Sequence, residues 1–248
     1  MKILEQVTLS QLVDPTWELN LQGVPNIQLN LKEGVYRPKL DTFVLAEALL
    51  RLVRESESVL DLGTGSGILA ILAAKLGAAR IVATDIHQES VTTAIANGRL
   101  NNVALRGAIG SMFTPLSDGE RFNLIVANIS SLPTSPNLPQ NHSYVGRVVN
   151  AGSDGRKYLD ILIEQAPCFL KKEGILLFQH SNFSNLEKSE MLLKQSGWGV
   201  ELVIREYPIG QTSAERIPYF LGHLPKNCHP IKREGSWYQK IGVFTARR

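Results

Sequence analysis

The sequence predicts an α/β fold with a doubly wound, mostly parallel, seven-stranded sheet that follows an N-terminal β-hairpin. Apolar runs of strand length alternate with longer runs of helical character between residues 58 and 196, and a glycine-rich turn joins the first of these strands to its helix. Strands that alternate with helices form mostly parallel sheets covered on both faces. The chain has 248 residues and is 44% hydrophobic, which suffices for one sizeable core.

The elements can be placed in order along the chain. The hairpin is expected over residues 17–31, where two stretches alternate apolar and polar residues around a Gln-Gly-Val-Pro-Asn turn. Asp41 or Thr42 is expected to cap the first helix, and Gly197 to end the last one. The expected helices are 43–53, 69–76, 88–102, 154–170 and 186–196. The expected strands of the main sheet are 58–62, 80–85, 104–109, 122–128, 174–180, 199–206 and 241–246.

The last two strands have no helix between them, so we expect an antiparallel pair at one edge of the sheet. The chain then divides into an N-terminal segment with the hairpin (residues 1–34) and a main domain (residues 35–248). Residues 130–154 form a long loop that includes three prolines. Residues 207–238 are expected to be irregular, and their aromatic side chains form either a substrate lid or a small satellite core.

Composition excludes several classes of function. The net charge of +3 is mild and no long basic run occurs, which disfavours a nucleic-acid partner. Cys168 and Cys228 lie far apart without metal-ligand spacing, so neither a disulfide framework nor a metal site is predicted. No apolar run reaches the length of a membrane span, and the N-terminus lacks a signal-peptide pattern. A cytoplasmic protein without a membrane partner is expected.

The stretch from Val59 to Ile68 predicts a cofactor site. An apolar strand ends in an acid, three glycines alternate with small polar residues, and a helix begins. Glycines allow positive φ and a close approach of a ligand to the backbone. The N–H groups at a helix start favour a negatively charged group in the same space. The turn therefore predicts a nucleotide-like cofactor.

Two acids and one missing glycine identify that cofactor. Asp85 ends the next strand and can accept hydrogen bonds from both ribose hydroxyls, as in NAD or S-adenosylmethionine (SAM) sites. The dinucleotide pattern requires a third glycine where Ile68 stands. The SAM pattern is an acid, one residue, then Gly-x-Gly-x-Gly, as Asp61 to Gly67 shows. SAM is therefore predicted, with Asp61 serving its ammonium group directly or through water.

These motifs resemble those of class I SAM-dependent methyltransferases, which have a Rossmann-like sheet. Over roughly residues 17–205 the chain is most similar to the HemK-type protein-glutamine methyltransferases. The hairpin, the stretch Val-Tyr-Arg-Pro-Lys-Leu-Asp-Thr-Phe from Val35, the glycine motif and Gly-Ser-Asp-Gly-Arg from Gly152 carry this resemblance. Ser111 stands where the family usually has an acid for the adenine amine. The expected cofactor-binding residues are Thr42, Asp61, Gly63, Thr64, Gly65, Gly67, Asp85, Ile86, Ser111, Met112 and Asn128.

The stretch after the fourth strand departs from that family. The family has Asn-Pro-Pro-Tyr there, which holds the amide that is methylated, and this chain has Asn128-Ile129-Ser130-Ser131. Val126 to Ile129 is also similar to the Ala-Asn-Ile-like stretch of the ribosomal-protein lysine and α-amine methyltransferases. Both resemblances imply transfer of a methyl group to nitrogen, and they disagree about the acceptor.

Three residues are candidates for catalysis. Asn128 lies at the carboxyl edge of the sheet, where ligands bind, and its carbonyl can hold the acceptor nitrogen; the alternative is a strand-end cap. Tyr158 can face the sulfonium by a cation–π contact or simply pack. Ser181 ends the fifth strand near the expected cleft, beside His180, which is read as a satisfied structural histidine rather than a base. The candidate substrate-binding residues are Tyr36, Arg37, Ser130, His142 and Tyr144.

Four functions stay open. The favoured one is a SAM-dependent N-methyltransferase whose acceptor is a small molecule, an amino acid or a peptide, because the acceptor motif is altered. The second is a protein N-methyltransferase that modifies a glutamine or a ribosomal protein. The third is a SAM cyclase, or other chemistry on the carboxypropyl group, that releases methylthioadenosine. The fourth is a SAM-binding protein without catalysis.

Overall fold

The computed structural model describes residues 7–13, 16–21, 23–136 and 150–248. These residues form two compact units. The first unit comprises Met1–Asn128 and Cys168–Leu177, and the second comprises Ile129–Pro167 and Phe178–Arg248. The expected division between residues 34 and 35 stays a prediction.

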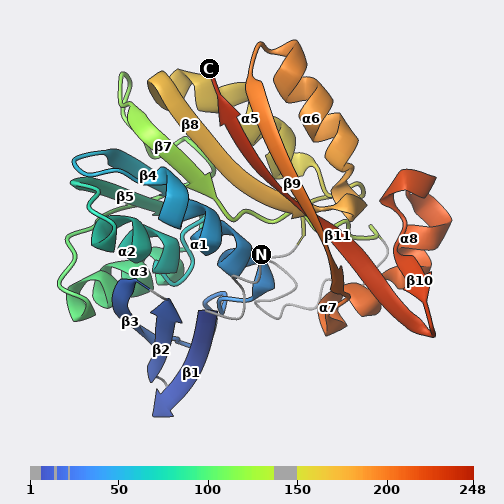
Figure 1. Ribbon diagram of the computed structural model, residues 1–248, viewed down its shortest axis with the longest axis horizontal. Coiled ribbons are helices and arrows are strands. Elements are labelled where there is room, and N and C mark those ends of the chain that lie inside the picture. The colour runs from blue at the N-terminus through green and yellow to red at the C-terminus, as the bar shows by residue number, and fades with distance from the viewer. Residues whose placement is uncertain (1–6, 14–15, 22, 137–149) are drawn as a thin grey trace. The chain divides into compact units, whose positions relative to one another are not determined.

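A small antiparallel sheet begins the first unit (Figure 1). Strands β2 (Thr16–Leu21) and β3 (Val24–Asn30) form the expected hairpin, with Glu18 opposite Gln28. Strand β1 (Val7–Val13) pairs with β2 and extends the hairpin to three strands. Ile27 and Leu29 are buried while their neighbours along β3 are more exposed, so one face of this sheet packs inward.

The main sheet of the first unit has the strand order β8-β7-β4-β5-β6. These strands are β4 (Ser58–Leu62), β5 (Arg80–Asp85), β6 (Arg106–Ile109), β7 (Phe122–Ala127) and β8 (Leu170–Ser181). β4 runs parallel to β5 and to β7, and β5 runs parallel to β6. Every residue of β4 is buried, as expected for a strand covered on both faces. The predicted parallel, doubly wound arrangement is confirmed.

Three helices belong to the first unit, namely α1 (Leu40–Leu52), α2 (Ile68–Lys75) and α3 (Gln88–Leu100). The prediction that Asp41 or Thr42 caps the first helix is wrong, because the helix begins at Leu40 and its N-cap is Lys39. Thr42 lies in the first turn, and its Oγ1 accepts a hydrogen bond from the Lys39 amide at 3.4 Å. Residues 40–42, which precede the predicted start of this helix at residue 43, thus form its first turn.

The second unit contains most of α5 (Lys157–Phe169), the end of β8, the short helix η2 (Asn182–Ser184) and α6 (Leu186–Gln195). Helix α5 begins three residues later than expected because Gly152 and Gly155 take φ values of 85° and 74°, which a right-handed helix does not allow. Gly197 has a φ of 81° and its amide donates to Lys194 O, which confirms the glycine end of α6.

Strands β9 (Gly199–Pro208) and β11 (Ser236–Arg247) are long antiparallel partners, which confirms the expected edge pair. The short β10 (Ile231–Arg233) also pairs with β11 and was not predicted. Among the described residues the sheet that contains β4 therefore has eight strands, one more than the seven expected.

The prediction that residues 207–238 are irregular is wrong. They contain α7 (Gln211–Ala214), α8 (Ile217–His223), the short helix η3 (Lys226–Cys228) and β10. Of the four prolines in this segment, Pro218 stands at the start of α8, where it does not break the helix. Phe220, Leu224 and Cys228 form a buried cluster with Phe183, and the two phenylalanine rings stack at 4.3 Å. The aromatic residue Phe220 thus serves the satellite core that sequence reasoning gave as one of two alternatives.

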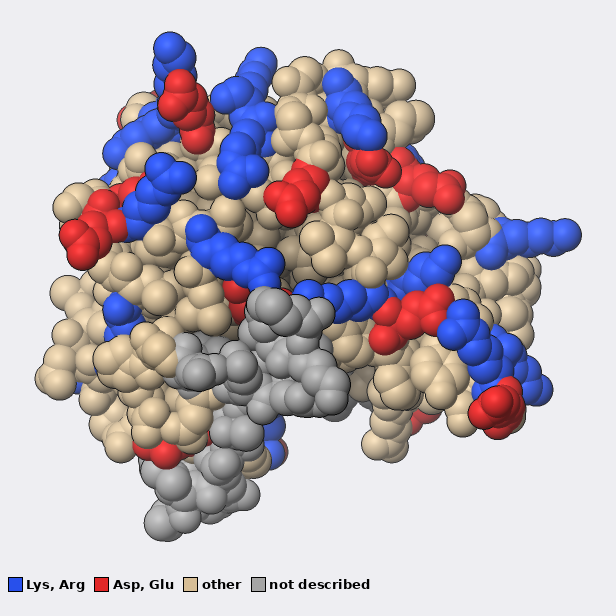
Figure 2. Space-filling view, viewed as in Figure 1, with Lys and Arg blue, Asp and Glu red and all other residues tan. Residues whose placement is uncertain are grey.

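Figure 2 shows Lys and Arg interspersed with Asp and Glu over the described part of the face in view. No large area of one sign is visible there, in keeping with the mild net charge. In the described ranges, no helix has the length and apolar character needed to cross a bilayer.

Candidate active site

The glycine turn of the first unit has the conformation that its sequence predicts. Gly63, Gly65 and Gly67 take φ values of 76°, 53° and 84°. A Cβ on Gly67 would lie 2.8 Å from the Cα and Cβ of Ala94, so this glycine lets α2 and α3 approach each other. A Cβ on Gly65 would make an ordinary van der Waals contact with Tyr36, at 3.7 Å, so at Gly65 the φ of 53°, and not crowding, disfavours a side chain. Gly67 therefore serves packing, while Gly65 serves the backbone conformation of the turn.

Asp61 is a buried carboxylate with one unsatisfied oxygen. Its Oδ2 accepts hydrogen bonds from Thr64 Oγ1 at 2.7 Å and from the Ala70 amide at 3.1 Å. Its Oδ1 is buried and has no hydrogen-bond partner. Burial raises the pKa of Asp61 to about 7, and the charge of Asp85 adds to the rise. A cationic ligand would satisfy this oxygen and stabilise the charged form, so the site fits the ammonium group of SAM.

Asp85 closes the other side of the turn. Its Oδ2 accepts from the Gly65 amide at 3.1 Å, and its Oδ1 accepts from the His87 amide at 2.9 Å. Burial raises its pKa, and these two amide hydrogen bonds oppose the rise. Each carboxylate oxygen can accept a second hydrogen bond. The group is thus oriented by the backbone and retains the capacity to accept hydroxyl donors such as those of a ribose.

Two exposed isoleucines flank Asp85. Ile109 is opposite Asp85 in the β5–β6 register and is 52% exposed, and Ile86 follows Asp85 and is 54% exposed. Exposed apolar side chains beside a polar group suit a flat ring such as adenine. Ser111 and Met112 follow at a tight turn, where Met112 takes a φ of 49°. Ile109 was not among the predicted site residues, although its position at a strand end was visible in the sequence.

A second polar cluster consists of Tyr36, two residues in the first turn of α1, and Asn128, which directly follows β7. Asn128 Nδ2 donates to Thr42 Oγ1 at 3.0 Å, and Tyr36 OH donates to Asp41 Oδ2 at 3.0 Å. Burial raises the pKa of Asp41, while hydrogen bonds from Tyr36, Thr42 and Asn128 oppose the rise. Leu62 and Ala127 are register partners in β4 and β7, so Asn128 leaves the sheet next to the glycine turn.

Asp41 is the residue of this cluster that sequence reasoning misjudged, because it was read as a helix cap. Its Oδ1 is buried without a hydrogen-bond partner, like Oδ1 of Asp61. The stretch from Val35 that resembles the HemK-type family includes this Asp-Thr pair, and that resemblance was the signal that could have identified Asp41 as a site residue. The other predicted residue of this stretch, Arg37, lies with its guanidinium 5.6 Å from the centre of the Trp17 ring.

Two asparagines connect the hairpin to the glycine turn. Asn97 accepts from the Asn30 amide at 2.8 Å and donates to Ser66 O at 2.9 Å. Asn101, one turn later on α3, accepts from the Gln28 amide at 2.9 Å and donates to Gln28 O at 2.6 Å. The side-chain amides thus take the place of a neighbouring strand along the edge of β3. This link positions the turn, and no local pattern predicts it.

The remaining predicted residues lie in the second unit or outside the described ranges. Tyr158 is half-buried, and Lys157 Nζ lies 5.1 Å from the centre of its ring. Ser130 Oγ is buried without a hydrogen-bond partner, and Ser181 ends β8 half-buried. His142 and Tyr144 are outside the described residues. The roles of these residues stay predictions.

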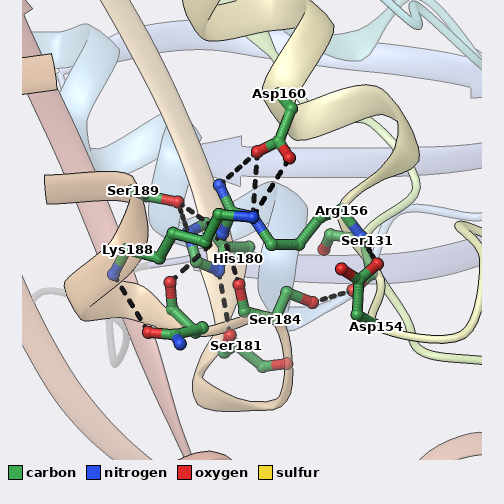
Figure 3. A network of polar contacts seen from close by, with 10 residues as sticks. Ser131, Asp154, Arg156, Asp160, His180, Ser181, Ser184, Lys188 and Ser189 are labelled. Carbon is green, nitrogen blue, oxygen red and sulfur yellow. Dashed lines mark hydrogen bonds and ion pairs between the residues drawn. The ribbon is translucent and has the colours of Figure 1, made fainter. Parts of the chain in front are cut away.

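Figure 3 shows a structural network in the second unit, centred on Arg156. The guanidinium is buried and donates to Asp160 Oδ1, to Ser184 O at 2.6 Å and to Ser189 Oγ at 3.0 Å. His180 Nε2 lies 2.8 Å from the same hydroxyl of Ser189. Burial lowers the pKa of His180 to about 3, so the ring is neutral near pH 7. This geometry agrees with the reading of His180 as a satisfied structural residue.

Comparison with known proteins places these features among methyltransferases. Residues 41–135 match the family model described as Ribosomal protein L11 methyltransferase (PrmA). A Methanocaldococcus jannaschii protein that carries the name protein N5-glutamine methyltransferase is 32% identical over 182 residues, which are 73% of this chain and 90% of that protein. The matched part of this relative is therefore nearly its whole length.

Longer relatives match over part of their length. The release factor glutamine methyltransferase of Geobacter sulfurreducens is 33% identical over 166 residues, which cover 65% of this chain and 58% of that protein. Among solved structures, the ribosomal protein L11 methylase of Lactobacillus delbrueckii subsp. bulgaricus has a TM-score of 0.55 and 25% identity, over 85% of this chain and 80% of that one. All three proteins are named for methyl transfer to a protein.

Proposed function

Because the chain belongs to the HemK-type protein N5-glutamine methyltransferases, a family of class I SAM-dependent methyltransferases, we propose that it methylates a side-chain nitrogen of a protein, and that this nitrogen is a glutamine amide. The cofactor is SAM. We favour a protein acceptor over the small-molecule, amino-acid or peptide acceptor expected from the sequence, because the similar proteins are named for protein acceptors. The prediction that the stretch from Asn128 to Ser131 corresponds to an altered Asn-Pro-Pro-Tyr motif stays a prediction.

The residues that hold SAM in this proposal belong to the first unit. When bound, SAM supplies an electrophilic methyl group on its sulfonium. The unsatisfied Oδ1 of Asp61 accepts the ammonium group, and Asp85 accepts the ribose hydroxyls. Ile86 and Ile109 cover the faces of the adenine, beside Ser111 and Met112. The proposed cofactor residues thus lie at the carboxyl ends of neighbouring parallel strands, where ligands bind in such sheets.

The observation that carries the proposal is the polar cluster of Asn128, Thr42, Asp41 and Tyr36. An amide nitrogen is a weak nucleophile because its lone pair is delocalised into the carbonyl group. A side-chain carbonyl that accepts the amide N–H orients the nitrogen, and orientation lowers the barrier of an in-line displacement. Thr42 holds the Asn128 side chain at 3.0 Å. Asp41 adds a buried oxygen without a hydrogen-bond partner that can accept a second acceptor N–H.

The other candidates complete the acceptor side of the proposal. Ser130 follows Asn128 along the chain and offers a buried hydroxyl. Tyr158 and Ser181 stay proposed catalytic residues on the evidence of the sequence alone, and Arg37 a proposed contact of the acceptor protein. His142 and Tyr144, which the sequence predicts to bind substrate, are proposed as further contacts of the acceptor.

Incubation with SAM and three kinds of acceptor tests the function. Purified release factor, purified ribosomal protein L11 and buffer alone are compared, with mass spectrometry of both the protein and the nucleoside products. A methylated protein nitrogen together with S-adenosylhomocysteine supports the proposal. Methylthioadenosine without an acceptor supports the carboxypropyl reading instead, and SAM binding without any turnover supports a non-catalytic protein.

A variant of Asn128 tests whether this residue takes part in the reaction. Asn128→Ala is expected to lower kcat at least 100-fold, because positioned hydrogen bonds at a reacting group are worth that much. Asn227→Ala, at an exposed position whose side chain donates to Glu187 and accepts from the Cys228 thiol, is the matched control and should retain activity. Full activity of Asn128→Ala would exclude Asn128 from the reaction.

A further inference from the structure

The chain that follows Asn128 is held by contacts with distant residues as well as by Pro133 and Pro136. Ile129, Ser130 and Ser131 include neither proline nor glycine, so nothing in their backbone restricts this stretch locally. Residues 129–136 lie against residues 150–156 of the same unit. The Thr134 amide donates to Gly152 O at 2.9 Å, and the Ala151 amide donates to Leu132 O at 3.4 Å. These two stretches, called here the paired stretches, form one piece of structure directly after Asn128.

Arg216, between α7 and α8, binds the first of the paired stretches. Its guanidinium NH1 donates to Thr134 Oγ1 at 2.7 Å and to Pro133 O at 3.2 Å. The side chain is half-buried. A charged donor with two acceptors on consecutive residues fixes the backbone there more firmly than a neutral hydrogen bond.

Tyr219, one turn further along α8, binds the second. Its hydroxyl donates to Ser153 O at 3.0 Å. The ring packs with Leu132 against the cluster of Phe183, Phe220, Leu224 and Cys228. Ser184, which precedes α6, also donates to Ser131 O (Figure 3). The paired stretches are thus held at several points by residues from far along the chain.

We propose that Arg216 and Tyr219 are positioning residues for the acceptor, and that the α7–α8 segment (residues 211–223) determines which acceptors this enzyme takes. The inference rests on the proposed function, in which the acceptor is held at Asn128 and Ser130. The segment acts by fixing the paired stretches, whose first residues follow Asn128 immediately in the chain. The residues that Arg216 and Tyr219 bond are not among the proposed SAM-binding residues, so we expect the segment to affect the acceptor and not the cofactor.

The predicted consequence is a selective loss of acceptor affinity. Arg216→Ala removes a charged donor from two acceptors, and we expect the acceptor KM to rise roughly 10-fold or more. Arg216→Lys keeps a charged donor and should restore part of the affinity. Tyr219→Phe removes only the hydroxyl and should raise KM by roughly 2- to 10-fold. The affinity for S-adenosylhomocysteine, measured by calorimetry, should stay unchanged in all three variants.

A double-mutant cycle separates positioning from general loosening. Thr134→Val removes the hydroxyl that Arg216 binds. If the proposal holds, Arg216→Ala and Thr134→Val are non-additive, because each removes the same interaction. Arg233→Ala is the control, since Arg233 lies in the neighbouring β10 and forms an exposed ion pair with Glu206.

Three results would overturn the proposal: an unchanged acceptor KM in Arg216→Ala, an equal loss in Arg233→Ala, or a parallel loss of S-adenosylhomocysteine affinity. Should the wild-type enzyme methylate no protein, the proposed function fails by itself. The effect of Arg216 on the paired stretches is then tested by amide hydrogen exchange at Thr134 and Ala151. Faster exchange in Arg216→Ala than in Arg233→Ala supports the positioning role, and equal exchange refutes it.

Discussion

Replacing Asp61 by Asn tests the site at its most constrained atom. In the wild-type protein Oδ2 accepts from Thr64 Oγ1 and from the Ala70 amide, while Oδ1 has no hydrogen-bond partner. An asparagine has one oxygen, which must serve those two donors. Its NH₂ group then takes the position of Oδ1 and presents a donor to the ammonium group of SAM. The substitution therefore replaces an attraction by a repulsion without changing the shape of the side chain.

The size of the effect follows from the charge. Hydrogen bonds to charged groups contribute about 1.5–3 kcal/mol, so the affinity for SAM should fall by roughly 10- to 150-fold. The wild-type affinity should also depend on pH, because burial raises the pKa of Asp61 to about 7 in the free protein and SAM requires the ionised form. Below that pH the affinity should fall by about 10-fold per unit, and above it the affinity should level off.

The same raised pKa has a consequence for stability. The folded protein holds the Asp61 proton more tightly than the unfolded chain, in which the pKa of this carboxyl group is 3.8. Stability from this group is therefore complete below about pH 4 and decreases as the pH rises to about 7, by at most about 4 kcal/mol. Asp61→Asn has no proton to lose. Without ligand, the variant should be more stable than the wild type at pH 8, while it binds SAM more weakly.

Calorimetric titration with SAM between pH 5.5 and 8.5, together with thermal unfolding of the free proteins, measures both effects. Asp118→Asn, at an exposed position of the same unit, is the control with the same change of charge. Equal SAM affinity in Asp61→Asn and the wild type would refute the ammonium assignment. An unchanged pH dependence of binding in the variant would show that another group titrates.

Two further predictions concern the same turn. Asp85→Ala should weaken SAM binding by roughly 10-fold or more, because two ribose hydroxyls lose a charged acceptor; unchanged affinity in calorimetry would remove the ribose assignment. Gly67→Ala places a Cβ 2.8 Å from Ala94, so we expect thermal unfolding several degrees below that of Gly119→Ala, which has a similar φ and nothing within 4 Å. Equal unfolding temperatures would show that strain at φ, rather than the contact, decides the outcome.

The elements that local sequence predicted well are those buried on all sides. β4, β5 and β7 are short apolar runs, and each was expected within one residue of its observed bounds. A strand covered on both faces is apolar along most of its length, so its pattern is clear once glycine and polar residues bound it. The glycine turn was predictable for a related reason, since its φ values exclude most side chains.

The segment 207–238 was mispredicted because its order comes from elsewhere in the chain. Helix α8 is short and begins beside a proline, which resembles loop sequence. It is stabilised by packing of Phe220 against Phe183, a residue that lies far away in the sequence. Short helices depend on such tertiary contacts, and a local pattern carries no information about the partner.

The sequence by itself determined the class of sheet and the cofactor, and it predicted the two acids proposed to serve that cofactor, because Asp61, Asp85 and the glycines owe their positions to one strand–turn–helix unit and the strand beside it. Only the tertiary structure decided how the residues proposed for the acceptor side are brought together. It brought Tyr36 to Asp41, Asn128 to Thr42 and Arg216 to Thr134. Two of these pairs join residues more than 80 positions apart. Hydrogen bonds of that range depend on the packing of whole elements, which no periodicity along the chain records.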